Sequence, residues 1–225
     1  MSRFSYGIFI QKADLNQVFP LLDVTDIVLR YHGDWIVILP EIFYGFHHES
    51  KLLSLSTVTP LLLASDAEDH GFSITVMSKK ETLFHFELAA ESDIWQGVWS
   101  EVAIELFGGE GADYVYSRIG TERDVMTQVN EVVQRRMDEG RLYAVHVEQA
   151  LLGVDDVSLG SFRLLGVSDE VIGDFGQFLR KDYCLGNSER LVSGLLDCLG
   201  IFDFPSLDYR AVAAGFDERF EIISV

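Results

Sequence analysis

Basic residues, cysteine and proline are all scarce in this chain of 225 residues. The 17 lysines and arginines face 36 aspartates and glutamates, which gives a formal net charge of -19 at pH 7. A surface of that charge repels nucleic acid and anionic membranes, and it attracts basic molecules. We therefore expect no nucleic acid and no membrane among the partners, and a basic protein is the partner class that the charge favours. The same acidity also serves solubility alone.

The cysteine count and the lack of long apolar runs predict a cytoplasmic protein. Cys184 and Cys198 are the two cysteines, too few for a disulfide framework, so a reducing compartment is favoured. The apolar run near the amino terminus is broken by Ser5 and Gly7 and is too short for a signal peptide. No stretch approaches the 18 consecutive apolar residues of a membrane-spanning helix.

Motifs for phosphate, nucleophile or redox chemistry are missing as well. The sequence has no Gly-Lys-Ser/Thr, no Gly-x-Ser-x-Gly and no Cys-x-x-Cys. The glycine-rich run at residues 108–111 follows a predicted helix instead of opening one, so it does not predict a phosphate-binding loop. We expect no cofactor, and these gaps weigh against an enzyme without deciding the question.

Alternating apolar residues in the first ninety positions predict a sheet. Residues 72–76 and 84–88 place apolar side chains at every second position, as half-buried antiparallel strands do. Residues 61–64 are apolar on both faces, which is typical of a central strand. Further strands are predicted at 4–10, at 27–31 and 35–39 on either side of Gly33, and at 220–225.

A helical period begins at Glu91 and continues through the second half of the chain. Helices are predicted from 91 to the glycines at 108 and 109, after Thr121, over 142–152, after Ser168 and after residue 187. Residues 110–120 are predicted to be a polar link that includes a short extended piece around Val115. The pattern predicts an α+β fold, in which a mostly antiparallel twisted sheet of about six strands is covered on one face by helices. A single domain over 1–225 is expected, with a subdivision into 1–109 and 121–225 as the alternative.

The densest group of ionisable side chains lies between two predicted strands. Asp66, Glu68, Asp69 and His70 offer oxygen ligands and one nitrogen, which is enough for part of a divalent-metal site, and His48 is a candidate fifth member. Crowded carboxylates also raise one another's pKa, as acid–base catalysis requires. The alternative is a solvated turn that keeps neighbouring strands from pairing with other chains.

Two smaller features complete the candidates. His85 and Glu87 share the polar face of one strand, so a hydrogen-bonded pair is predicted between them. His146 lies on a predicted helix, and neither cysteine has a histidine at a recognisable spacing. The cysteines are therefore interpreted as small core residues.

The first functional hypothesis is a non-catalytic binding protein whose acidic surface, mainly after residue 90, engages a basic partner. Bacterial immunity proteins and other masking inhibitors share this acidic composition and lack of active-site motifs, an analogy of composition alone. A divalent-metal-dependent hydrolase that uses Asp66, Asp69 and His70 with help from His48 is the second hypothesis. A structural or oligomer-forming module is the third. The sequence does not fix the oligomeric state.

Overall fold

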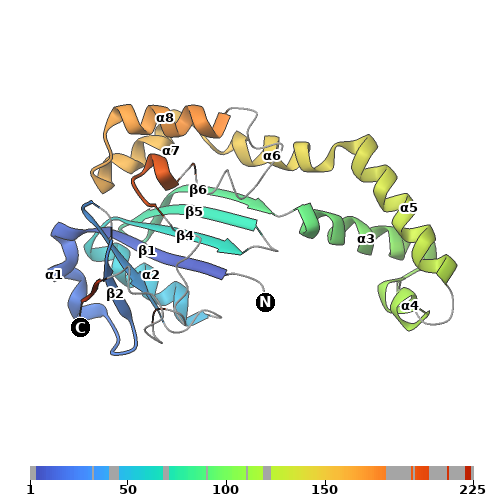
Figure 1. Ribbon diagram of the computed structural model, residues 1–225, viewed down its shortest axis with the longest axis horizontal. Helices are drawn as coiled ribbons and strands as arrows, with labels where there is room; N and C mark the ends of the chain where they lie inside the picture. Colours follow the sequence, from blue (N-terminus) through green and yellow to red (C-terminus); the bar gives the residue numbers. More distant parts are fainter. Residues whose placement is uncertain are drawn as a thin grey trace.

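The computed structural model describes residues 4–31, 33–40, 46–67, 71–89, 91–109, 111–118, 123–180, 194, 196–202, 212 and 221–223. These residues form an antiparallel sheet of seven strands with helices packed against it and a largely helical second half (Figure 1). The predicted α+β class is therefore confirmed.

The strand order across the sheet is β6-β5-β4-β1-β3-β2-β7, and every neighbouring pair is antiparallel. The last strand lies within the strand predicted at 220–225, and it pairs with β2 and joins the six strands of the first ninety residues. Gly33, between β2 and β3, has a φ of 62°, in agreement with the predicted hairpin. The strands are β1 (Phe4–Gln11), β2 (Ile27–Arg30), β3 (Trp35–Leu39), β4 (Leu61–Ala67), β5 (Gly71–Ser78), β6 (Glu81–Ala89) and β7 (Glu221–Ile223).

Helices cover both faces of the sheet, where the sequence led us to expect one. The alternation in β1 shows why, because Phe9 lies in the core on one face while Ile8 and Ile10 lie in the core on the other. The first face packs against the later helices, with Phe84 of β6 in edge contact with Phe162, at 5.0 Å between ring centroids. The second face packs against Leu55 of α2. The central strands are thus apolar on both sides, as the run at 61–64 predicted.

The helices that cover the sheet come from three parts of the chain. Short helical turns η1 and η2 and helix α1 lie between β1 and β2, and α2 lies between β3 and β4. The helices of the first face come after residue 141. The bounds are η1 (Lys12–Asp14), α1 (Leu15–Val18), η2 (Phe19–Leu21), α2 (Phe46–Val58), α6 (Leu142–Leu152), α7 (Asp156–Leu159), η3 (Gly160–Leu165) and α8 (Asp169–Arg180).

Three helices leave the sheet at the end of β6 and form a projection, which we call the helical arm (Figure 1). It consists of α3 (Glu91–Phe107), α4 (Gly111–Arg118) and α5 (Arg123–Gly140), and the chain returns to the sheet through α6. The prediction of an extended piece around Val115 is wrong, because this residue lies in α4. Val115 is buried against α3 and α5, and this tertiary burial stabilises a helix that its eight residues alone would not.

None of the described helices is long and apolar enough to cross a lipid bilayer.

Candidate functional site

The predicted acidic turn lies mostly outside the described residues. Asp66 belongs to strand β4, which runs to Ala67, and its Cα is paired with Ser5 of β1 and Phe72 of β5. Glu68, Asp69 and His70 lie outside the described part of the chain, and so does the side chain of His48, whose backbone lies in α2. The metal-site hypothesis therefore stays a prediction. Within the described residues, no three His, Cys, Asp or Glu side chains are placed to hold a metal ion.

The predicted pair of His85 and Glu87 is confirmed, and it extends to a third residue. The Nε2 atom of His85 lies 3.3 Å from a carboxylate oxygen of Glu87, while its Nδ1 atom lies 2.9 Å from the hydroxyl of Thr75. Thr75 is the direct cross-strand neighbour of His85 on β5. Because His85 and Glu87 are about half exposed or more on a strand surface, we interpret this row as a cross-strand contact that fixes side chains on the sheet.

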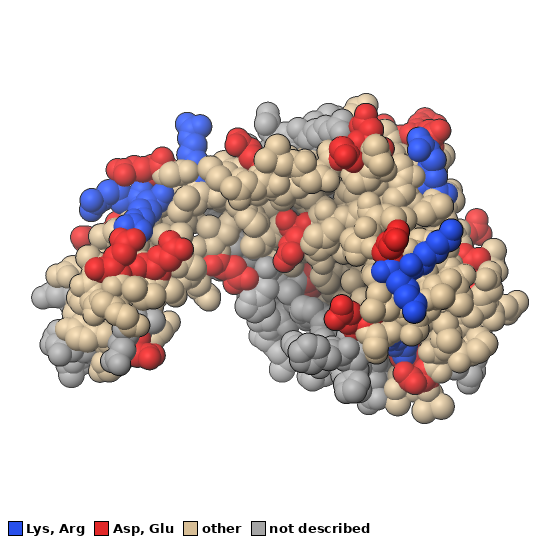
Figure 2. All heavy atoms as spheres, turned by 180° about the vertical axis from the view of Figure 1, so that it is seen from behind, with Lys and Arg blue, Asp and Glu red and all other residues tan. Residues whose placement is uncertain are grey.

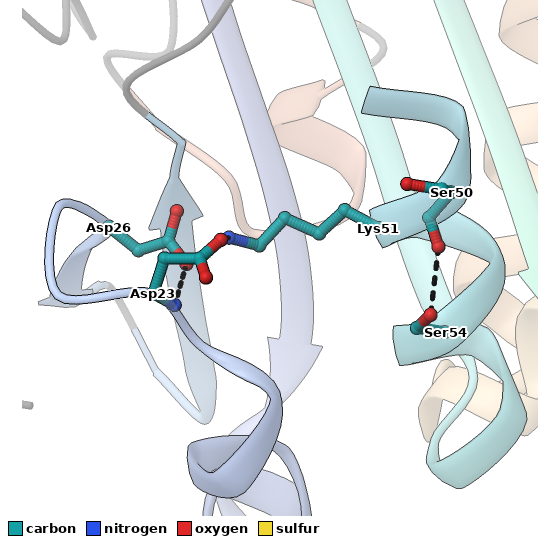
Figure 3. Close-up of polar contacts among 5 residues, drawn as sticks. All are labelled: Asp23, Asp26, Ser50, Lys51 and Ser54. Carbon is teal, nitrogen blue, oxygen red and sulfur yellow. Dashed lines mark hydrogen bonds and ion pairs between the residues drawn. The ribbon is translucent and has the colours of Figure 1, made fainter. Parts of the chain in front are cut away.

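A buried ion pair joins α2 to the loop before β2 (Figure 3). The ammonium group of Lys51 lies 2.8 Å from Asp23 and also contacts Asp26. The side chain of Asp26 is only 2% exposed and that of Lys51 12%, so removing either charge would leave the other buried without a counter-charge. The hydrogen bond from Lys51 lowers the pKa of Asp23, which keeps this carboxylate ionised. The cluster therefore connects α2 to the loop before β2.

His146 connects the return helix α6 to the end of the sheet. Its Nε2 atom accepts a hydrogen bond of 3.0 Å from the backbone N–H of Ala89, the last residue of β6. An accepting Nε2 atom carries no proton, so the proton of the neutral ring is on Nδ1. The contact lies where the helical arm leaves the sheet and returns to it. It joins residues 57 positions apart, a distance over which a sequence pattern gives no signal.

The helical arm has its own small core, separate from the two cores of the sheet. The indole N–H of Trp99 donates to the side-chain oxygen of Asn130 on α5 at 3.1 Å, and the ring of Trp99 contacts Tyr116 of α4 at 5.3 Å between centroids. Gly111 lies so close to α3 that a Cβ atom there would be 2.2 Å from the carbonyl oxygen of Ala103. The buried residues of this core are Trp99, Val102, Ala103, Val115, Val125, Val129 and Val133.

Acidic side chains dominate the outer surface of the arm. In Figure 2, where the arm lies at the left, red side chains are spread over it and blue ones gather on its upper part. Between positions 91 and 140 the sequence has eleven acidic and four basic residues. The described acidic side chains of the arm that are exposed are Glu101, Glu105, Asp113, Glu131, Asp138 and Glu139.

One ion pair crosses the arm and organises part of this charge. The guanidinium of Arg136 on α5 makes two hydrogen bonds to Glu105 on α3, the longer of them 3.1 Å. These bonds lower the pKa of Glu105 and raise the pKa of Arg136, whose charge is also favoured by Glu101. Exposed pairs of this kind add little stability. The arm is thus a helical surface on which acidic groups outnumber basic ones.

The cysteines offer no reactive centre in the described part of the chain. Cys198 is half-buried beside the larger core, and burial, together with Asp174 and Asp197, raises its thiol pKa. A raised pKa leaves little of the nucleophilic thiolate at neutral pH. Cys184 lies outside the described residues.

In comparisons with known proteins, no family model, no curated protein and no solved structure matches this chain.

Proposed function

We propose that this chain is a non-catalytic binding protein that engages a basic protein partner through its acidic surface, in the manner of immunity and inhibitor proteins. The observation that supports the proposal is the helical arm, which stands away from the sheet and carries six exposed acidic side chains. Its two basic residues with described side chains are Arg135 and Arg136, and Arg136 is already paired with Glu105.

The physical argument concerns how such a surface finds its partner. A surface on which acidic groups outnumber basic ones has a negative potential, which speeds the encounter with a protein of opposite charge. The separate core of the arm holds the acidic groups on a fixed backbone, so little conformational entropy is lost when they bind. Salt screens these interactions, and the association therefore weakens as ionic strength rises.

The test compares two charge-reversal variants of the full-length chain. In the arm variant, Glu101, Glu131 and Glu139 are replaced by lysine; in the control variant, Asp34, Glu49 and Glu81 are. All six positions are exposed, and both variants change the net charge equally. Tagged protein captures its partner from a lysate of the organism that encodes it, and the captured protein is then purified for measurement of Kd.

We expect a partner with a high isoelectric point whose Kd rises at least tenfold between about 50 and 500 mM salt. The arm variant should bind it at least tenfold more weakly than the wild type, and the control variant should bind within about threefold of the wild type. A Kd that does not respond to salt would remove the acidic surface from the function. If both variants bind more weakly than the wild type and to the same extent, the net charge matters and the position of the charges on the arm does not.

A further inference from the structure

Helix α6 packs one side against the larger core through Val147, Tyr143, Ala150 and Leu151, and it leaves two further apolar side chains, Val145 and Leu152, exposed. Its sequence is LYAVHVEQALL, and the structure describes all eleven residues. Val147 is the one residue among them that is fully buried. Part of this helix therefore presents an apolar surface to solvent.

The exposed apolar side chains continue from α6 into α7. Val145 and Leu152 are seven residues apart and so lie on the same face of α6, with Glu148 between them. Leu152 and Val157 of α7 are each 84% exposed. Acidic residues lie along the same segment. We call the exposed residues of this continuous segment the α6–α7 ridge: Val145, Glu148, Leu152, Asp155, Asp156 and Val157.

The backbone that carries the ridge is firmly held, so its exposure does not come from a frayed end. Val154 is buried in the larger core between the two exposed positions. Asp155 begins α7 with a capping box, in which its carboxylate accepts from the N–H of Ser158 at 2.7 Å and its own N–H donates to the Ser158 hydroxyl at 3.1 Å. Such reciprocal bonds fix the entry of a helix. Leu152 and Val157 are thus presented on a rigid turn.

We propose that the α6–α7 ridge docks a basic amphipathic segment of the partner. Its apolar side chains would cover Val145, Leu152 and Val157, and its lysines or arginines would face Glu148, Asp155 and Asp156. Charge selects this occupant over a second copy of the chain, because two copies, each of net charge -19, would bring like charges together across the contact. The inference rests on the proposed function, in which the partner is basic.

The probes are two synthetic peptides of one composition. The first is a helical peptide of about 14 residues, with leucines at positions i, i+3, i+4 and i+7 between flanking arginines, as helix-in-groove ligands have. The second has the same residues in an order without an apolar face. Binding to the full-length chain is measured by fluorescence anisotropy at about 150 mM salt, where long-range attraction is largely screened.

The ridge variant carries Leu152→Ser and Val157→Ser, and the control variant carries Val24→Ser and Ile222→Ser, which are also exposed apolar positions but lie outside the ridge and the arm. We expect the helical peptide to bind about tenfold more tightly than the reordered one. The ridge variant should lose about tenfold in affinity for the helical peptide, while the control variant keeps it. Because all four positions are exposed, we expect both variants to fold, which circular dichroism checks.

Three results would overturn the inference. Equal affinity for the two peptides would mean that only charge is recognised, and an undiminished affinity of the ridge variant would place the binding elsewhere. A wild-type chain that sediments as a dimer, and becomes a monomer in the ridge variant, would mean that a second copy covers the ridge. The proposed function fails separately, by salt-independent capture of the partner. If the arm variant loses the partner while the ridge variant keeps it, only the ridge inference falls.

Discussion

At the scale of single residues, Lys51 makes a polar contact on which stability should depend, because it neutralises the carboxylate of Asp26, whose side chain is almost fully buried. Replacing Lys51 with methionine would preserve much of its length and leave Asp26 without a counter-charge. We expect Lys51→Met to lower the free energy of unfolding by about 3 kcal/mol, measured by urea denaturation at pH 7. The exposed Lys12→Met should change it by less than about 0.5 kcal/mol. Similar values for the two variants would mean that the buried pair contributes nothing net.

The same lysine gives a prediction about pH. Because Lys51 lowers the pKa of Asp23 in the folded protein, the stability from this carboxylate is fully present above the pKa of unfolded aspartate. It is lost as the pH falls through the lower folded-state value. In the Lys51→Met variant we expect the pKa of Asp23 to rise toward its ordinary value, as measured by NMR titration. An unmoved titration curve would assign the lowering to another group.

His146 makes a hydrogen bond at the base of the arm, and two replacements of its side chain test the contribution of this bond to stability. In His146→Ala the N–H of Ala89 loses its acceptor, and we expect a loss of about 1 kcal/mol in the free energy of unfolding. In His146→Gln the side-chain carbonyl can accept the same bond, so part of the loss should be recovered. Two equal losses would indicate that the ring packs and that its nitrogen atom is unimportant. Urea denaturation of both variants measures the difference.

At the scale of elements, the sequence predicted what depends on local periodicity and failed where tertiary contacts decide. The strands were predicted because one or both faces are buried, which leaves a period of two or a continuous apolar run. Helix α4 was missed, since Gly108 and Gly109 precede this short helix, Gly111 is its first residue, and its burial against α3 leaves no pattern in the sequence. The pair of His85 and Glu87 was predicted because the two residues are two positions apart on one strand and so share a face. The contacts of Lys51 and His146 were not predicted, because they join residues that are far apart in the sequence. The arm itself had no signal beyond an acidic, helical composition.

The packing of α4 on α3 gives a prediction at this scale. In Gly111→Ala the new Cβ atom would meet the backbone of Ala103 at 2.2 Å, and the two helices would have to separate. We expect a loss of about 1–3 kcal/mol in the free energy of unfolding, with faster hydrogen exchange confined to the arm. Gly109→Ala is the matched control, because nothing lies within 4 Å of its Cβ position. Unchanged exchange in Gly111→Ala would show that α4 does not pack on α3 in this way.

At the scale of the whole molecule, the net charge of -19 acts on the folded state as well as on a partner. Like charges held close together by folding repel one another, and salt screens that repulsion. We therefore expect the Tm to rise by several degrees as sodium chloride increases from about 20 to 500 mM. The arm variant and its charge-reversal control both change the net charge from -19 to -13, so each should show a smaller rise. A Tm that falls with salt would mean that attractive ion pairs, such as that of Glu105 with Arg136, outweigh the repulsion. An equal rise in all three proteins would mean that salt acts by strengthening the burial of apolar surface and not by screening charge.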